Sequence, residues 1–196
     1  MTKRMVVGIS GASGIIYGVR ALELLRESNV QTHLVISKSA KLTLHHELDM
    51  SVKELEALAD VVHPAQDVGA SIASGSFDTA GMLIAPCSVR TMSEIATGVT
   101  STLLTRAADV VLKERRRLVL MLRETPLHTG HIQTMLRLSE MGAVIAPPVP
   151  AFYTRPESLD DVVTQSVGRT LDLFDLSVAQ VQRWRGGRTE TETKAD

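Results

Sequence analysis

Short apolar runs separated by helix-length stretches constrain the fold of this chain more than any other feature. The runs cover residues 5–9, 33–36, 82–85, 118–122 and 143–146, and aliphatic residues without regular polar alternation dominate each of them. Such runs are typical of strands in a parallel sheet that is buried on both faces. Helical patterns lie between and after them, at residues 16–26, 40–48, 51–59, 91–96, 103–113, 129–141 and 158–174. This alternation predicts a single α/β domain with a Rossmann-like (flavodoxin-like) doubly wound parallel sheet flanked by helices.

Composition excludes several classes of protein. The chain has 196 residues, 44% of them hydrophobic, which suits one domain with a real core. A net charge of −1 and 3% aromatic residues give no basis for binding nucleic acid or an acidic membrane. No run reaches the roughly 18 apolar residues of a membrane span. The single cysteine allows no internal disulfide, which agrees with a cytoplasmic location.

The domain is expected to cover residues 1–184. Residues 185–196 are small, polar or charged, and we expect them to form a disordered tail. Within the domain, the informative residues should follow each strand, since ligands of open parallel sheets bind beyond the carboxyl ends of the strands.

The first apolar run leads into a segment of small residues, 8–14, with the sequence GISGASG. Small residues let the backbone approach an anion, and the next helix would point its first N–H groups at it. The spacing is neither GxGxxG nor that of a phosphate-binding loop with its lysine. A tight turn before a helix explains the segment equally well.

The second and third runs are followed by hydroxyl groups. Ser37 could contact a ligand or cap the next helix, and the cap is the simpler interpretation. The third run is stopped by a proline and continues as residues 86–91, PCSVRT, which place hydroxyls, a cation and free N–H groups at a helix start. That arrangement can hold an anion, although an ordinary N-cap would look the same. Cys87 has no histidine near it in sequence, so we expect a buried, inert thiol.

Different kinds of residue follow the last two runs. Arg123 and Glu124 follow the fourth run directly, and we favour a functional role because strand ends form the binding edge. Three prolines stiffen the loop after the fifth run, where Phe152 and Tyr153 could wall an apolar pocket.

No metal site is predicted. His45, His46 and Glu47 adjoin one another, but no second cluster of ligands supports them. The only acidic pair, residues 160–161, lacks the further carboxylates that a magnesium–diphosphate site would need.

Taken together, these motifs resemble the UbiX/Pad1 family of flavin prenyltransferases, closest to the UbiX type. The similarity runs from residue 5 to about residue 184. Its strongest stretches are residues 8–14, 74–77 (SGSF), 86–88, 106–110 (RAADV), 112–114 (LKE), 123–127 (RETPL) and 147–153.

The resemblance implies an enzyme that joins a dimethylallyl group from dimethylallyl phosphate to reduced FMN, at N5 and C6, without a metal. The product, prenylated FMN, would serve a UbiD-type decarboxylase, in ubiquinone biosynthesis or in aromatic-acid breakdown. The family assembles as a homododecamer with each site at a subunit junction.

The resemblance also assigns roles to residues. Ser13, Glu47, Lys113 and Glu124 would be catalytic, and Lys113, Tyr153 and Arg169 would bind dimethylallyl phosphate. FMN would contact Gly11, Ala12, Ser13, Ser37, Ser88, Val89, Arg90, Thr91, Arg106 and Arg123. Some relatives carry asparagine at Thr102 and Thr134 and tryptophan at Val68, so this chain differs from them in pocket detail without losing a catalytic group.

Two other functions compete with this one. Flavin-dependent cysteine decarboxylases share the fold but carry a PxMNxxMW signature, which this chain lacks. A plain FMN-binding subunit of an aromatic-acid decarboxylase is the second. The presence of Glu47, Lys113, Glu124, Tyr153 and Arg169 argues against a pure binder.

Overall fold

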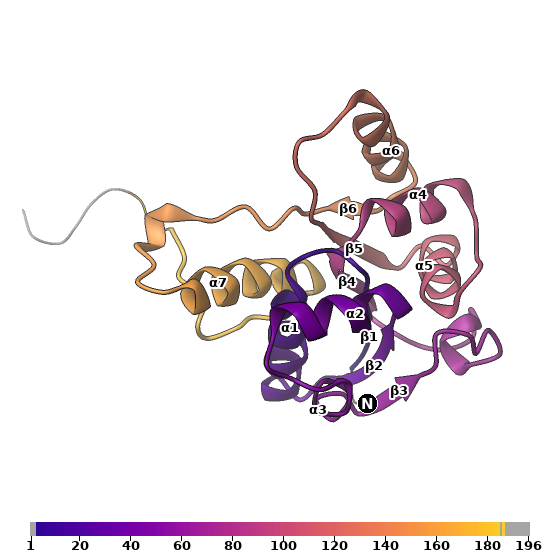
Figure 1. The fold of residues 1–196 in the computed structure, drawn as a ribbon, viewed down its shortest axis with the longest axis horizontal. Coiled ribbons are helices and arrows are strands. Elements are labelled where there is room, and N and C mark those ends of the chain that lie inside the picture. The colour runs from indigo at the N-terminus through magenta and orange to yellow at the C-terminus, as the bar shows by residue number, and fades with distance from the viewer. Residues whose placement is uncertain (1–2, 185, 187–196) are drawn as a thin grey trace, which may run out of the picture.

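A six-stranded sheet forms the centre of the computed structural model, which describes residues 3–184 and 186 (Figure 1). Its strands are β1 (Arg4–Ile9), β2 (Gln31–Ile36), β3 (Val61–His63), β4 (Gly81–Cys87), β5 (Arg117–Leu122) and β6 (Val144–Ile145). Every neighbouring pair is parallel, and the order is β3-β2-β1-β4-β5-β6. The predicted doubly wound parallel sheet is therefore confirmed, with the strand order of Rossmann folds rather than that of flavodoxin.

Helices cover both faces of this sheet. One hydrophobic cluster joins it to α1 (Ile15–Glu27), α2 (Lys38–Glu47), α3 (Val52–Glu56) and α7 (Leu159–Leu171). The other joins it to α4 (Val89–Thr97), α5 (Leu103–Lys113) and α6 (Thr129–Glu140). Every residue of β4 is buried, which is why the sequence shows an unbroken apolar run there. Short 3-10 turns complete the described elements: η1 (Ser71–Ala73), η2 (Phe152–Thr154) and η3 (Asp172–Phe174).

The structure differs from the sequence-based expectation at three elements. The sequence predicts five strands, but β3 is a sixth, a three-residue edge strand too short and too exposed to show an apolar run. The prediction that Pro86 stops the third run is wrong, because β4 continues to Cys87. The register shifts between Ile84 and Cys87, so the missing N–H of proline is tolerated. The predicted last helix ends at Leu171 and continues as η3.

The segment 147–158, here called the arm, leaves the sheet after β6. Figure 1 shows it running away from the sheet to η2 and returning as α7. Its apolar side chains are exposed: Val149 by 74%, Phe152 by 76% and Tyr153 by 45%. Within one chain, Phe152 and Tyr153 therefore do not enclose an apolar pocket.

Two findings concern the remaining expectations. None of the described helices is both long and apolar enough to span a bilayer. The expected disordered tail, 185–196, lies outside the described residues except for Gly186.

Candidate active site

The strand order reverses at the carboxyl ends of β1 and β4, and we call this edge of the sheet the crevice. These strands are neighbours, but the chain continues from β1 toward β2 and from β4 toward β5. Such a switch point is where ligands bind in doubly wound sheets. Ser10 locks the two loops there. It is 1% exposed, its hydroxyl donates to Pro86 O at 2.9 Å, and its Oγ accepts from Ser88 N at 2.8 Å.

The amino end of α4 offers free amides to this crevice. Ser88 is the N-cap, and its Oγ accepts from Thr91 N at 3.2 Å. The amides of Val89 and Arg90 come first in the helix, where no acceptor exists within the helix itself. The Arg90 side chain points to solvent and pairs with Glu94 at 2.8 Å. The cap and the anion cradle thus coexist, since the serine satisfies one amide and leaves two available for a phosphate.

The amino end of α1 is occupied by the protein's own carboxylate. Glu47 Oε2 accepts from Gly14 N at 2.8 Å and from Ile15 N at 3.0 Å, and the Ser13 hydroxyl also bonds to this carboxylate. Gly14 itself has a left-handed backbone and no side chain to cap the helix. The first two amides of this helix are thus satisfied by Glu47, as in a tight turn before a helix, and a ligand contact at residues 11–13 stays a prediction.

Arg123 extends this group into a charged cluster. Partial burial raises the pKa of Glu47, but hydrogen bonds from Ser13, Ile15 and Gly14 and the positive charge of Arg123 together hold it below its ordinary value. Burial raises the pKa of Tyr17, and the charge of Arg123 partly opposes this. We call Ser13, Tyr17, Glu47 and Arg123 the cluster.

The loop residues Gly11 and Ser37 lie beside one another. Ser37 caps α2, with its Oγ accepting from Ala40 N at 3.1 Å, and it lies 3.1 Å from Ser39 Oγ. A side chain on Gly11 would collide with Ser39. The glycine is therefore required by the close approach of the first loop to α2.

The end of β5 supplies the remaining residues of the crevice. Arg123 N donates to Cys87 O at 3.0 Å, which places this strand end next to that of β4. Arg123 is exposed, and the half-buried Glu124 accepts from Thr125 N at 2.9 Å. Cys87 is fully buried, so the predicted burial of this thiol is confirmed, and burial raises its pKa to about 12, which disfavours the reactive thiolate.

A single chain does not bring the other predicted residues to this crevice. Lys113 ends α5, just before β5 begins with Arg117, which pairs with Gly81 at the amino edge of the sheet. Six residues of strand span about 20 Å, so Lys113 lies near the opposite edge from Arg123. Lys113 pairs with Glu114 there.

Three more predicted residues also point to solvent or to local partners. Arg106 pairs with Asp109 along α5 at 2.8 Å, Arg169 pairs with Asp172 near the end of α7, and Tyr153 sits on the arm. Arg169 and Tyr153 are about half exposed, so both are available to another molecule.

Sequence reasoning missed Ser10 and Tyr17. A buried serine at the end of an apolar strand could have signalled the first. The role of Tyr17 depends on its neighbour Arg123, which lies 106 positions away in the printed sequence and shows only in the fold.

The groups at this edge of the sheet suit an anionic ligand. Free amides at α4, the cation of Arg123 and a loop of small residues meet at one edge. Among residues 3–184 and 186, no group of three or more histidine, cysteine, aspartate or glutamate side chains could hold a metal ion.

Comparison with known proteins gives consistent results. A family model described as Flavoprotein matches residues 1–171. The flavin prenyltransferase UbiX of Escherichia coli (strain K12) is 59% identical over 187 residues, covering 94% of this chain and 99% of that protein. The flavin prenyltransferase UbiX of Thauera aromatica is 57% identical over 192 residues, covering 98% and 99%.

Solved structures agree with these relatives. The crystal structure of AnUbiX (PadA1) in complex with FMN and dimethylallyl pyrophosphate has a TM-score of 0.95 at 48% identity, covering 96% of this chain and all of that one. A dodecameric FMN-dependent UbiX-like decarboxylase from Escherichia coli O157:H7 has a TM-score of 0.91 at 49% identity, covering 93% and 100%.

Proposed function

This chain belongs to the UbiX flavin prenyltransferases within the flavoprotein family, and from that membership we propose its reaction and the residues that perform it. The protein transfers a dimethylallyl group from dimethylallyl phosphate to reduced FMN, at N5 and C6, and releases prenylated FMN and phosphate. The observation that carries the proposal is the cluster at the switch point. There, a hydroxyl, a carboxylate and a guanidinium lie at strand ends that hydrogen bonds from Ser88 N to Ser10 Oγ and from Arg123 N to Cys87 O join to the start of α4.

The FMN-binding residues of the proposal line this crevice. Residues 11–13, Ser37, residues 88–91 and Arg123 would hold FMN, with the α4 amides on its phosphate, and Arg106 would assist. Transfer breaks the bond between the prenyl carbon and the phosphate oxygen, and the phosphate leaves with the electron pair. Cations and a proton donor make that departure easier.

Ser13, Glu47 and Glu124 would move the protons of the reaction. Glu47 is held as an anion by its hydrogen bonds, which suits acceptance rather than donation of a proton near neutral pH. Glu124 would supply the proton to the leaving phosphate. The second bond, to C6, would use the electrons of the prenyl double bond, whose other carbon takes up a proton, and the proton lost from C6 would pass to a base or to the released phosphate.

The phosphate-binding residues require a second copy of the chain. Lys113, Tyr153 and Arg169 are exposed and lie away from the cluster of their own chain. We propose that the chain forms a homododecamer in which they complete the site of a neighbour, as the dodecameric relative suggests. The proposal includes one FMN-binding domain (1–184) and delivery of the product to a UbiD-type decarboxylase. It also includes a cytoplasmic location, which a single buried thiol supports.

One experiment tests the reaction. Purified protein with reduced FMN is incubated without oxygen or metal, with dimethylallyl monophosphate or with the diphosphate, and the released flavin is weighed by mass spectrometry. A flavin heavier by one prenyl unit with the monophosphate is expected. Unmodified FMN with both donors would mean that the chain only binds flavin and that the catalytic proposal is wrong.

A further inference from the structure

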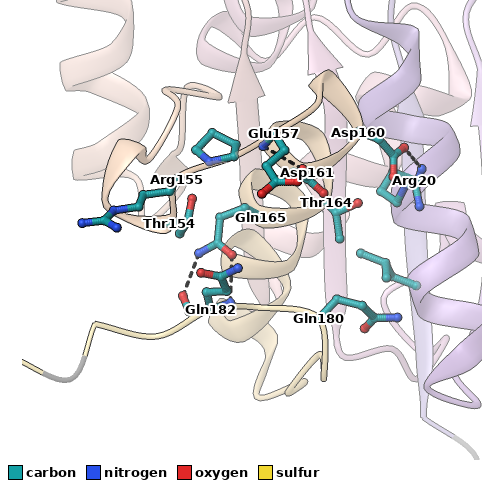
Figure 2. A pocket seen from close by; sticks show the side chains of 12 residues that line it. Arg20, Thr154, Arg155, Glu157, Asp160, Asp161, Thr164, Gln165, Gln180 and Gln182 are labelled. Carbon is teal, nitrogen blue, oxygen red and sulfur yellow. Dashed lines mark hydrogen bonds and ion pairs between the residues drawn. The ribbon is translucent and has the colours of Figure 1, made fainter. Parts of the chain in front are cut away.

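A buried amide connects the arm to the end of the described chain. Gln165 lies on α7 and is only 5% exposed. Its Nε2 donates to Gln182 O at 2.9 Å, and its Oε1 accepts from Gln182 N at 2.9 Å, as the dashed lines in Figure 2 show. The same Nε2 lies 3.4 Å from the hydroxyl of Tyr153, which in turn donates to Gln182 O at 3.4 Å. Gln165 therefore bonds both to the arm and to the segment 178–184, which we call the strap.

The strap is anchored on α7 independently of this amide. Val178 and Val181 are 6% and 8% exposed, and a side chain on Gly168 of α7 would collide with Val181. Beyond that anchor, Trp184 meets the ring of Tyr153 edge-on, with centroids 5.7 Å apart and an interplanar angle of 79°. The strap is thus a fixed support against which the arm can be aligned.

Packing does not hold the arm on its other side. A cleft of about 580 Å³ lies next to Gln165, between the arm, α1, α7 and the strap (Figure 2). Arg20 of α1 pairs with Asp160 at one end of this cleft, and Gln165 and Gln182 line the other. Gln165 contacts the arm beside this space at the Tyr153 hydroxyl, while Asp161 holds the base of the arm by accepting from Glu157 N and Ser158 N at 3.0 Å.

An amide here is not needed for the core. Val163 and Val167 belong to the hydrophobic core cluster, but they lie two positions away from Gln165 and therefore on another face of α7. A buried polar group lowers stability unless it is hydrogen-bonded, and this amide is bonded through both its nitrogen and its oxygen, which points to a role in orientation rather than in packing.

We propose that Gln165 is a positioning residue that fixes, through the strap, the orientation in which the arm presents the Tyr153 hydroxyl to dimethylallyl phosphate in a neighbouring copy. This inference rests on the substrate-binding role proposed above for Tyr153. It adds that the productive position of that tyrosine is set from α7, outside the crevice.

The test compares two glutamines of the same cleft. Gln165→Met removes the amide at nearly constant volume, and Gln180→Met makes the same change where the amide bonds only to the exposed Glu27. Gln165→Met should raise KM for dimethylallyl phosphate about tenfold, or about 1.4 kcal/mol. FMN affinity and turnover at saturating dimethylallyl phosphate should stay unchanged. Gln180→Met should behave as wild type in all three measurements.

Trp184 gives a readout independent of activity, because it is the only tryptophan of the chain. Iodide should quench its fluorescence more strongly in Gln165→Met, because its contact with Tyr153 loosens. Quenching should not change in Gln180→Met. If Gln165→Met does not assemble like the wild type, Gln182→Pro replaces it, since proline removes the backbone donor to Gln165 Oε1.

Tyr153→Phe separates the two levels of the argument. It should raise KM alone, and adding Gln165→Met should raise KM little further, because both changes act on one contact. A normal KM in Gln165→Met beside a raised KM in Tyr153→Phe would overturn the positioning role. A normal KM in Tyr153→Phe would remove the proposed role of Tyr153 and this inference with it.

Discussion

Replacement of Glu47 tests whether this carboxylate acts as the cap of α1. It accepts both Gly14 N and Ile15 N through one oxygen, so a glutamine carbonyl can keep both bonds. Glu47→Ala leaves two amides without an acceptor and should lower the free energy of unfolding by about 1–2 kcal/mol, as loss of an N-cap does. Glu47→Gln loses the interactions of its charge with the helix end and with Arg123, together about 0.5–1 kcal/mol.

The pH dependence of the free energy of unfolding gives a second test of the Glu47 charge. The folded pKa of Glu47 is lower than its ordinary value. Its charge therefore stabilises the fold fully above the ordinary pKa, and this contribution is lost as pH falls through the lowered one. The difference between wild type and Glu47→Gln should thus shrink between about pH 5 and pH 3.

Urea unfolding at one fixed protomer concentration measures both effects, because assembly makes stability concentration-dependent. Glu56→Gln is a suitable control, since Glu56 makes one surface ion pair, with Lys41 at 3.2 Å. Equal losses for the alanine and glutamine variants, or a difference from wild type that stays constant with pH, would refute the capping argument.

Three further predictions follow from the structure. Gly11→Ala should weaken FMN binding and lower stability by about 1–3 kcal/mol, because the new methyl group collides with Ser39; flavin titration and urea unfolding measure this. Burial lowers the pKa of His33, as do the nearby His63 and Arg4, while Asp60 opposes them. Burial also lowers the pKa of His63, and Asp67 opposes it. The free energy of unfolding should therefore fall as pH drops below about 6.5, and less so in His63→Gln. Glu124→Gln should keep its FMN affinity but form product roughly 10²-fold more slowly in a single-turnover assay.

Each of these has an informative control or a contradicting result. Gly69→Ala should be silent, because its new methyl group meets only Asp67 at an ordinary 3.6 Å. An equal loss of stability in wild type and His63→Gln below pH 6.5 would show that the histidine pair does not titrate with unfolding. Wild-type product formation by Glu124→Gln would make Glu124 structural.

The sequence by itself determined the layered fold. Strands buried on both faces are mostly apolar, so β1, β4 and β5 are visible as apolar runs, and β2 as a shorter one because its buried Thr32 and His33 are polar. Caps are equally local: the serine and glutamate three positions apart at Ser51 and Glu54 form a capping box at the start of α3. The sequence does not reveal the edge strand β3, because only one neighbouring strand, β2, pairs with it and its composition therefore carries little signal.

The sequence does not determine the site in the same way, because the contacts of the site join residues far apart in the chain. The motif at 8–14 indicates a close backbone approach, but only the fold shows that Glu47, from the end of α2, fills the start of α1. Likewise, Arg123 and Lys113 look like neighbours in sequence, yet β5 separates them by the length of the sheet. Hydrophobic periodicity records which face of an element is buried, whereas which strand ends meet is decided by the order in which the elements pack.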